Sequence, residues 1–320
     1  MDKVLATIFS QELITFWLSL FTVLIERHMP WPDKYHPLSL WKLFTIRMAD
    51  KVLPTKEFGA KQQKLSGSLA FIVLLVPVCV SIAVFLYMSV YPVFFEALLL
   101  LIALRYKNTQ LVCHRLSKQI ALDKKILARH TLQPIVLRET NQMSVLGLAK
   151  AACETLILRF NYQYCGVMFW FMLTGGVGAI LYRLLYESSQ SWNIKLTRFS
   201  NFGLSVKFLV TCLQWLPTLL SGFSLALASL TFRGLFALSK VKTLLDIRGY
   251  ILNVGGACLN IELAGPAIYQ QHKIRTIKCG GHKQVILVDI KRVQNLVNLA
   301  IYLWLAVSFL IYALLYAAAQ

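Results

Sequence analysis

The chain has 320 residues, of which 57% are hydrophobic and only 15% are charged. This composition argues against a soluble globular protein, whose surface needs more charge, and favours a chain that lies largely in a lipid bilayer. A net charge of +19 would elsewhere suggest nucleic-acid binding, but beside long apolar runs it indicates basic loops, and no nucleic-acid partner is expected.

Apolar segments along the chain predict transmembrane helices, because a hydrocarbon core about 30 Å thick calls for roughly 20 apolar residues. The sequence therefore predicts an all-α, polytopic integral membrane protein that forms a single membrane domain over residues 1–320, with five or six spans and helical cytoplasmic loops. The six segments cover residues 4–25, 68–90, 91–104, 164–182, 205–230 and 297–319.

The third segment is short for a crossing, since a helix over residues 91–104 is about 21 Å long. It needs either a thinned bilayer or additional turns beyond Arg105. The distribution of charge favours a crossing. If the six segments alternate from an outside N-terminus, 28 Lys and Arg residues lie in the inner loops 26–67, 105–163 and 231–296, and five lie outside.

The second inner loop contains an amphipathic pattern. Val112, Leu116, Ile120 and Leu127 recur at helical spacing, with Arg115, Lys118, Lys124 and Lys125 on the other face. Such a helix lies on anionic lipid or packs over a cytoplasmic site, and both alternatives stay open. Pro134 should end it. Ser144 is an N-cap residue for a following helix that continues into the fourth span, with Lys150 and Glu154 spaced for an i,i+4 ion pair.

Glycines mark two further regions. The pair Gly175 and Gly176 inside the fourth span predicts close helix packing rather than ligand contact. In the last inner loop the density of glycine favours ordinary turns over a ligand-binding loop, because no spacing matches a P-loop or a dinucleotide fingerprint. The residues there are Gly255, Gly256, Gly265, Pro266, Gly280 and Gly281. Cys279 and His282 form a lone pair of metal-ligating residues without a second pair nearby, so no metal site is expected.

Short motifs in a shared order resemble the CobD/CbiB family of membrane-bound cobalamin biosynthesis proteins, whose members are adenosylcobinamide-phosphate synthases. The resemblance covers most of the chain. The motifs are His36-Pro37-Leu38, Leu122-Asp123, Ala128-Arg129, Arg138-Glu139-Thr140, Ala151-Ala152-Cys153-Glu154, Phe169-Trp170, Gly175-Gly176, Tyr182-Arg183, Trp215-Leu216-Pro217, Gly255-Gly256-Ala257, Gly265-Pro266 and Tyr269.

This resemblance implies ATP-dependent amide coupling of adenosylcobyric acid, a corrinoid, to aminopropanol or its phosphate, with ATP and Mg²⁺ as cofactors. It also implies a multi-pass protein of the bacterial inner membrane whose basic loops face the cytoplasm. The expected partners are the lipid bilayer and anionic small molecules, and assembly into a homo-oligomer is left open.

The candidate catalytic residues are Glu154, Arg138, Glu139 and His36. The imidazole of His36 can bind phosphate or move a proton, or it is an idle surface group. Arg138 suits phosphate or carboxylate recognition, or it makes a loop salt bridge. Glu154 faces a cavity or pairs with Lys150. The candidate substrate-binding residues are Asp123, Arg129, Thr140, Tyr182, Arg183, Gly255, Gly256, Gly265 and Tyr269.

The chain departs from the family pattern at acidic and polar positions, which would weaken binding of Mg²⁺. The departures are Leu158, Arg159 and Tyr162, then Tyr186, Glu187 and Ser189, then Leu209, Val210, Thr211 and Leu219. The same loss is seen in the related ancillary membrane protein of β-lactamase induction, AmpE, which the chain also resembles. The alternative function is therefore a non-enzymatic membrane sensor or accessory protein on the same scaffold.

Overall fold

The computed structural model describes residues 11–29, 31–32, 35–53, 59–239, 246–270 and 272–318, and helices form most of this part of the chain. The prediction of an all-α integral membrane protein is confirmed. In these residues, the helical segments long and apolar enough to cross a bilayer are α4 (Ala60–Met88), α8 to α9 (Val145–Ser191), α10 (Leu204–Ser229) and α13 (Leu287–Ala318).

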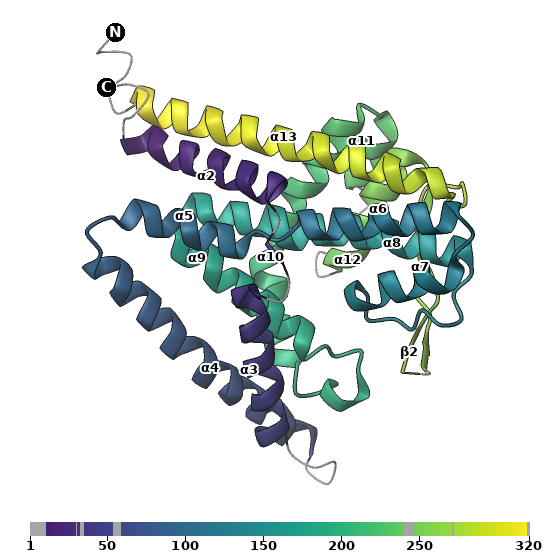
Figure 1. Ribbon diagram of the computed structural model, residues 1–320, viewed down its shortest axis with the longest axis horizontal. Coiled ribbons are helices and arrows are strands. Elements are labelled where there is room, and N and C mark those ends of the chain that lie inside the picture. Colours follow the sequence, from purple (N-terminus) through teal and green to yellow (C-terminus); the bar gives the residue numbers. More distant parts are fainter. Residues whose placement is uncertain are drawn as a thin grey trace.

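The first predicted span forms α2 (Gln11–His28), which runs beside α13 (Figure 1). The guanidinium of Arg27 lies 4.9 Å from the centre of the Tyr302 ring, which ties the two helices together. Residues 4–10 of the first predicted span and residue 319 of the last lie outside the described residues.

The first basic loop is helical. His36 caps α3 (Pro37–Val52), and the indole N–H of Trp41 donates to the Leu184 carbonyl at 3.0 Å, so this helix packs against α9. The long helix α4 follows and leaves most of its apolar side chains exposed, as expected for a helix that faces lipid.

The short third segment forms α5 (Pro92–Ala103), a helix of 12 residues that is about 18 Å long. It does not borrow turns beyond Arg105, because Leu104 ends it in extended geometry and a separate helix begins at Lys107. Whether α5 crosses the bilayer completely stays a prediction. α5 and α4 meet at a turn where the Phe85 and Phe95 rings are 4.7 Å apart.

The predicted amphipathic helix is two helices, α6 (Lys107–Ala121) and α7 (Lys125–Leu132). Asp123, between them, has a φ of 56°, which no α-helix continues through. The apolar face of α6 is buried against α8 and α13. Of the two alternatives, the structure therefore supports a helix that packs on protein and not one that lies on lipid. Pro134 ends α7 as predicted, within the short 3₁₀ helix η2 (Gln133–Ile135).

α8 (Val145–Arg159) is the centre of the half of the fold that the basic loops form. Ser144 is its N-cap, as predicted, with its hydroxyl accepting from the Gly147 N–H at 3.1 Å. Nearly every residue from Leu148 to Ile157 is buried, because α6, α7, α12 and α13 surround the helix. A helix that is apolar on all sides is stable only in such surroundings.

α8 continues through a π-helical turn, η3 (Phe160–Cys165), into α9 (Gly166–Ser191), and α9 folds back on itself at Gly175. Gly175 has φ 70° and ψ −160°. A straight helix would separate residues 162 and 186 by about 36 Å. Instead, the rings of Tyr162 and Tyr186 stack at 5.1 Å, and the Tyr182 hydroxyl donates to the Tyr162 carbonyl at 2.9 Å.

The fourth predicted span, residues 164–182, is therefore not one straight crossing but a helical hairpin. Its second arm returns the chain to the side from which the first arm started. The segment after it, predicted to lie outside, contacts two predicted inner loops: Arg198 pairs with Asp50 at 2.5 Å, and Lys195 donates to Tyr269 at 3.3 Å. These contacts contradict the predicted alternation, because segments that touch outside a bilayer lie on one side of it.

The remaining elements pack around α8 and α10. They are η4 (Thr197–Phe199), α11 (Phe232–Ser239), α12 (Ile247–Leu259), β1 (Glu262–Ala264), β2 (Ala267–Tyr269), β3 (His272–Ile274) and β4 (Lys278–Gly280). β1 pairs antiparallel with β4, with Leu263 opposite Cys279, and β2 pairs antiparallel with β3. The ladder that contains β2 projects at the end of the molecule near α7 (Figure 1), whereas β1 and β4 pack against α12.

Candidate functional site

Glu154 is a buried carboxylate on α8, exposed by only 1%. Its Oε2 accepts from the Arg138 guanidinium at 2.6 Å and lies 3.6 Å from that of Arg248. Its Oε1 accepts the backbone N–H of Ala264 at 2.9 Å. A buried carboxylate requires such partners, because an unpaired buried charge costs several kcal/mol.

The segment before α8 brings Arg138 to this carboxylate. The backbone N–H of Glu139 donates to the Ile268 carbonyl at 3.0 Å, which joins the segment to strand β2. Thr140 is buried and donates to the Arg129 carbonyl at 3.3 Å, while the Arg129 guanidinium donates twice to the Met143 carbonyl. Arg129 and Thr140 thus shape the loop that presents Arg138 and do not themselves reach Glu154.

Tyr269 is the second centre of the site and comes from β2. The Lys195 ammonium donates to its hydroxyl at 3.3 Å and lies 4.8 Å from the ring centre, and the positive charge of the Arg248 guanidinium also acts on the phenol. Burial acts to raise the pKa of Tyr269, but the charges and hydrogen bonds of Lys195 and Arg248 outweigh it, so this pKa lies below its usual value. Burial, and then the charge of Arg248, lowers the pKa of Lys195.

The predicted ion pair between Lys150 and Glu154 is wrong. Lys150 instead pairs with Glu262 at 3.3 Å, and Lys278 pairs with the same carboxylate at 3.1 Å. The hydrogen bond from Lys278, followed by the one from Lys150, lowers the pKa of Glu262. Strand β1 places Glu262 beside Lys150, so Lys150 pairs with Glu262. Glu154 therefore pairs with Arg138 and Arg248 instead.

Cations exceed carboxylates in this cluster. Arg138, Lys195 and Arg248 meet around Glu154 and Tyr269, and they come from three separate segments of the chain. Arg248 is about 30% exposed, so an anionic ligand can reach the cluster from solvent. Guanidinium groups bind phosphate and carboxylate through paired N–H donors, which makes the cluster chemically suited to an anionic substrate.

A magnesium site built from protein carboxylates does not fit the same residues. Both oxygens of Glu154 already accept hydrogen bonds. Within the described ranges, no three His, Cys, Asp or Glu side chains gather closely enough to hold a metal ion, and Cys279 and His282 gain no further ligand there. The cations fit the phosphates of a nucleotide, whereas the donors that a dedicated Mg²⁺ site needs are not assembled.

The glycines of the last inner loop differ from one another. Gly255 and Gly256 lie inside α12, where they permit close packing against Ile157 and Gly280, so the prediction of ordinary turns is wrong for them. Gly265 has a φ of 104° and does lie in a turn, directly after Ala264. Gly176 packs against the backbone of α5, which confirms the expected close packing.

Asp123, Tyr182 and Arg183 lie away from the cluster, as does His36. Asp123 is exposed in the turn after α6 and pairs with Lys125 at 3.4 Å. Tyr182 and Arg183 are buried in the returning arm of α9, where Tyr182 bonds the first arm and Arg183 pairs with Glu187 at 2.8 Å. Tyr182 therefore helps to hold the two arms of the α9 hairpin together, whereas Arg183 pairs within its own arm.

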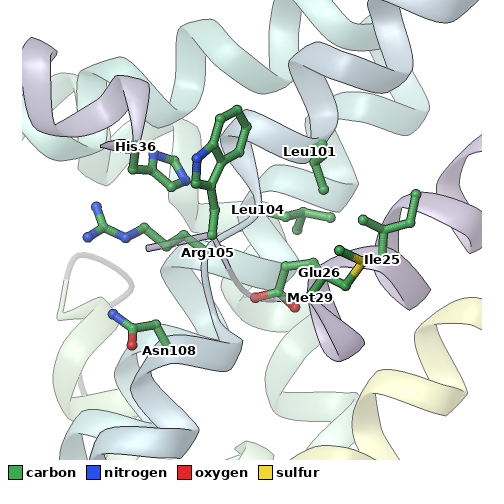
Figure 2. Close-up of a pocket in the computed structure, with 9 residues that line it drawn as sticks. Ile25, Glu26, Met29, His36, Leu101, Leu104, Arg105 and Asn108 are labelled. Atoms are coloured by element: carbon green, nitrogen blue, oxygen red, sulfur yellow. The ribbon is translucent and has the colours of Figure 1, made fainter. Parts of the chain in front are cut away.

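His36 is buried rather than on the surface, and its Nδ1 accepts the Leu38 N–H at 3.2 Å as the cap of α3. It lines a cavity of about 170 Å³ together with Glu26, Arg105 and Asn108 (Figure 2). This cavity belongs to the ends of α2 and α5 and is separate from the Glu154 cluster.

Sequence reasoning missed Lys195 and Arg248. The sequence places Lys195 on the outer side of the membrane because it predicts one straight span over residues 164–182. The signal against that interpretation was present, since Gly175 and Gly176 adjoin at the middle of the segment, where a chain reversal needs a residue without Cβ. Some departures from the family pattern also meet in space, because Tyr162 and Tyr186 stack on each other.

Comparison with known proteins gives a consistent result. The chain matches the family model described as CobD/Cbib protein over residues 19–299. It is 26% identical to the cobalamin biosynthesis protein CobD of Chromobacterium violaceum over 296 residues, which cover 89% of this chain and 93% of that protein. No solved structure shows a significant match.

Two further relatives carry the same name. The cobalamin biosynthesis protein CobD of Stutzerimonas stutzeri is 31% identical over 144 residues, or 44% of this chain and 48% of that protein. The protein of that name from Halalkalibacterium halodurans is 24% identical over 231 residues, or 69% and 72% of the two chains.

Proposed function

Because the chain belongs to the CobD/Cbib family of cobalamin biosynthesis proteins, we propose that it is the ligase of that pathway, an adenosylcobinamide-phosphate synthase. It would couple a carboxyl group of adenosylcobyric acid to aminopropanol or its phosphate in an ATP-dependent reaction at the bacterial inner membrane, with the basic loops in the cytoplasm. The observation that carries the proposal is the meeting of Arg138, Lys195 and Arg248 around Glu154 and Tyr269.

These cations suit the anionic groups that such a reaction brings together. ATP, when bound, would supply the activation of the carboxyl group. Arg138 and Arg248 would hold phosphate or carboxylate oxygens, because charge-assisted hydrogen bonds to preorganised donors stabilise developing negative charge. Glu154 would orient both arginines, since its carboxylate fixes the two guanidinium groups.

Tyr269 would act as the general base that accepts the proton of the attacking amine. When the amine forms the new C–N bond, it loses a proton, and a base within hydrogen-bond reach must accept it. The Oη atom of Tyr269 accepts a hydrogen bond from Lys195, and the positive charges of Lys195 and Arg248 favour its phenolate form. The carboxylates of the cluster, Glu154 and Glu262, pair with arginine and lysine side chains, so the proposed reaction uses no metal ion that these carboxylates would bind.

The alternative, an accessory protein without catalysis, gains no support from the comparisons. The matched relatives named above carry a cobalamin biosynthesis description.

The test follows labelled aminopropanol phosphate into product in membranes that contain the protein, adenosylcobyric acid and ATP. We expect turnover by the unsubstituted chain and a loss of at least about tenfold for Glu154→Gln and for Arg138→Ala, because each releases a cation from its position. Exposed Arg115→Gln on α6 serves as control and should leave turnover unchanged.

Absence of turnover with the unsubstituted chain would contradict the proposed ligase. Equal turnover in Glu154→Gln and the unsubstituted chain would remove Glu154 from the site and leave the family membership intact. Glu154→Gln keeps the size of the side chain and its acceptor for Ala264, so membrane insertion should be preserved.

A further inference from the structure

Contacts with α9 fix which side of α3 is buried and which side faces outward. The indole N–H of Trp41 donates to the Leu184 carbonyl at 3.0 Å, and the indole N–H of Trp192 donates to the Thr45 carbonyl at 3.0 Å. The buried side chains of α3 are Leu38, Trp41, Thr45 and Ala49. The opposite side of the helix therefore points away from the protein.

The outward side of α3 is apolar in its first half and basic in its second half. Leu40 and Phe44 are 61% and 53% exposed. Arg47 and Lys51 are exposed further along the same stripe, because three or four residues make one helical turn. An order from apolar to basic along one stripe is typical of a helix that passes from the hydrocarbon into the headgroup layer of a membrane.

α4 shows the same order in the opposite direction. Lys61 and Lys64 are exposed in its first turns, and Leu65 and Leu69 follow with 59% and 54% exposure. Figure 1 shows the end of α3 beside the start of α4, and the two helices pack against each other. The cations of both helices therefore lie at one level, and the apolar side chains of both lie on the same side of that level.

The four cations lack partners of opposite charge. Asp50 is the one acidic residue of α3, and it pairs with Arg198 at 2.5 Å. α4 has no acidic residue. Among the described residues no side chain forms an ion pair with the remaining cations, which we call the basic collar: Arg47, Lys51, Lys61 and Lys64.

The exposed leucine and phenylalanine side chains beside the collar form an apolar stripe that consists of Leu40, Phe44, Leu65 and Leu69. Along α3, Leu40 lies about 16 Å from Lys51. One headgroup layer is only about 5–8 Å deep, so a collar in that layer places the far end of the stripe in hydrocarbon. The stripe also continues into the exposed apolar side of α4, which is long and apolar enough to cross a bilayer.

We infer that the basic collar and the apolar stripe together bind anionic phospholipid. The collar holds the headgroup phosphates, and the stripe lies against the acyl chains. An acidic protein would balance the charge of the collar but would not account for the stripe, because the stripe is continuous with the lipid-facing side of α4. α3 is then a membrane-embedded helix rather than a free cytoplasmic loop, and this holds whether or not the chain is a ligase.

Native mass spectrometry of the detergent-solubilised full chain tests the inference. The chain is titrated with phosphatidylglycerol or with phosphatidylcholine that has the same acyl chains, and the Kd of the first bound lipid is measured. We expect tighter binding of phosphatidylglycerol. The double variants Arg47→Gln/Lys51→Gln and Lys61→Gln/Lys64→Gln should each weaken it by about tenfold or more and leave phosphatidylcholine unchanged, because each removes two charges near the headgroup.

The matched control is Arg115→Gln/Lys118→Gln, which removes two exposed cations from α6 and should leave the binding of phosphatidylglycerol unchanged. Glycerol phosphate and a decaglutamate peptide should not displace the bound lipid, because neither has acyl chains for the apolar stripe. The inference is overturned if the unsubstituted chain binds both lipids equally, if both collar variants keep its Kd, if the α6 control weakens binding as much, or if either soluble anion displaces the lipid.

A second measurement locates the stripe without depending on charge. A nitroxide label on Phe44→Cys in phosphatidylglycerol nanodiscs should collide more often with oxygen, which dissolves in hydrocarbon, than with a water-soluble nickel chelate. A label on Asp123→Cys, in the exposed turn after α6, should show the reverse. The signal of the unsubstituted chain, which has cysteines of its own, is subtracted. Preference for the nickel chelate at both positions would place α3 in water and overturn the inference.

Discussion

Glu154 and Lys150 lie one turn apart on α8, yet each binds a partner from another part of the chain. Local spacing favours their ion pair by only about 0.2–0.5 kcal/mol, whereas removing one partner from a buried charged pair costs about 3–5 kcal/mol. Because Glu154 is buried and Glu262 is more exposed, the tertiary contacts decide the pairing. Residue roles in this site follow from burial rather than from spacing.

Tyr269 provides a test at the residue scale. Lys195 and Arg248 hold its pKa below the usual range of tyrosine, so its phenolate should form at a lower pH than that of an ordinary tyrosine. Ultraviolet absorbance of tyrosinate during a pH titration measures this. Tyr269→Phe should remove the earliest phase, and Lys195→Met should move that phase to higher pH because one stabilising positive charge is lost.

The control for the titration is Lys125→Met, which removes an exposed cation at the α6–α7 turn. It should leave the early phase in place. An early phase that persists in Tyr269→Phe, or a shift to lower pH in Lys195→Met, would contradict the proposed environment of the phenol and weaken its role as a base.

α9 shows how a single element can change the topology. Its amino acids are apolar enough for a span, and hydropathy alone does not distinguish a straight helix from a hairpin of the same composition. The reversal depends on Gly175, whose φ of 70° and ψ of −160° fall in a region that essentially only glycine adopts. Gly176 then lets the hairpin tip approach the backbone of α5 at Glu96.

Substitution of the hairpin residue has a defined expected cost. Gly175→Ala should destabilise the protein by about 1–3 kcal/mol, because alanine at this φ and ψ is strained. The thermal unfolding midpoint of the detergent-solubilised chain measures the effect. Gly59→Ala is the matched control, since its φ is negative and a Cβ there meets nothing within 4 Å.

Equal unfolding midpoints for Gly175→Ala and Gly59→Ala would show that the chain does not reverse at Gly175. The stacking of Tyr162 on Tyr186 supplies a second readout, because the midpoint losses of Tyr162→Ala and Tyr186→Ala should be non-additive where the two rings are in contact.

For the whole molecule, the hairpin changes the side on which residues 192–203 lie. The contacts from Lys195 to Tyr269 and from Arg198 to Asp50 require one side for this segment and for the loops that carry the candidate site. Arg183, Lys195, Arg198 and Lys207 then lie towards the side of those loops.

Labelling of single introduced cysteines with a membrane-impermeant reagent tests this arrangement. The labelling of the unsubstituted chain, which has cysteines of its own, is subtracted as background. Ser200→Cys and Lys61→Cys should react from the same side of the membrane, and Tyr87→Cys, near the far end of α4, should react from the other. Reaction of Ser200→Cys together with Tyr87→Cys, and apart from Lys61→Cys, would contradict the hairpin topology.

By itself, the sequence determined the membrane class, the helical character of the loops, the N-cap at Ser144, the break at Pro134 and the family, because composition, local capping and motif order are properties of short stretches. Only the tertiary structure decided the reversal at Gly175, the pairing of Glu154 with Arg138 and Arg248, and the recruitment of Lys195. Each of these depends on which distant segments come together to satisfy a buried charge or fill a packed interior, and local spacing carries no information about that.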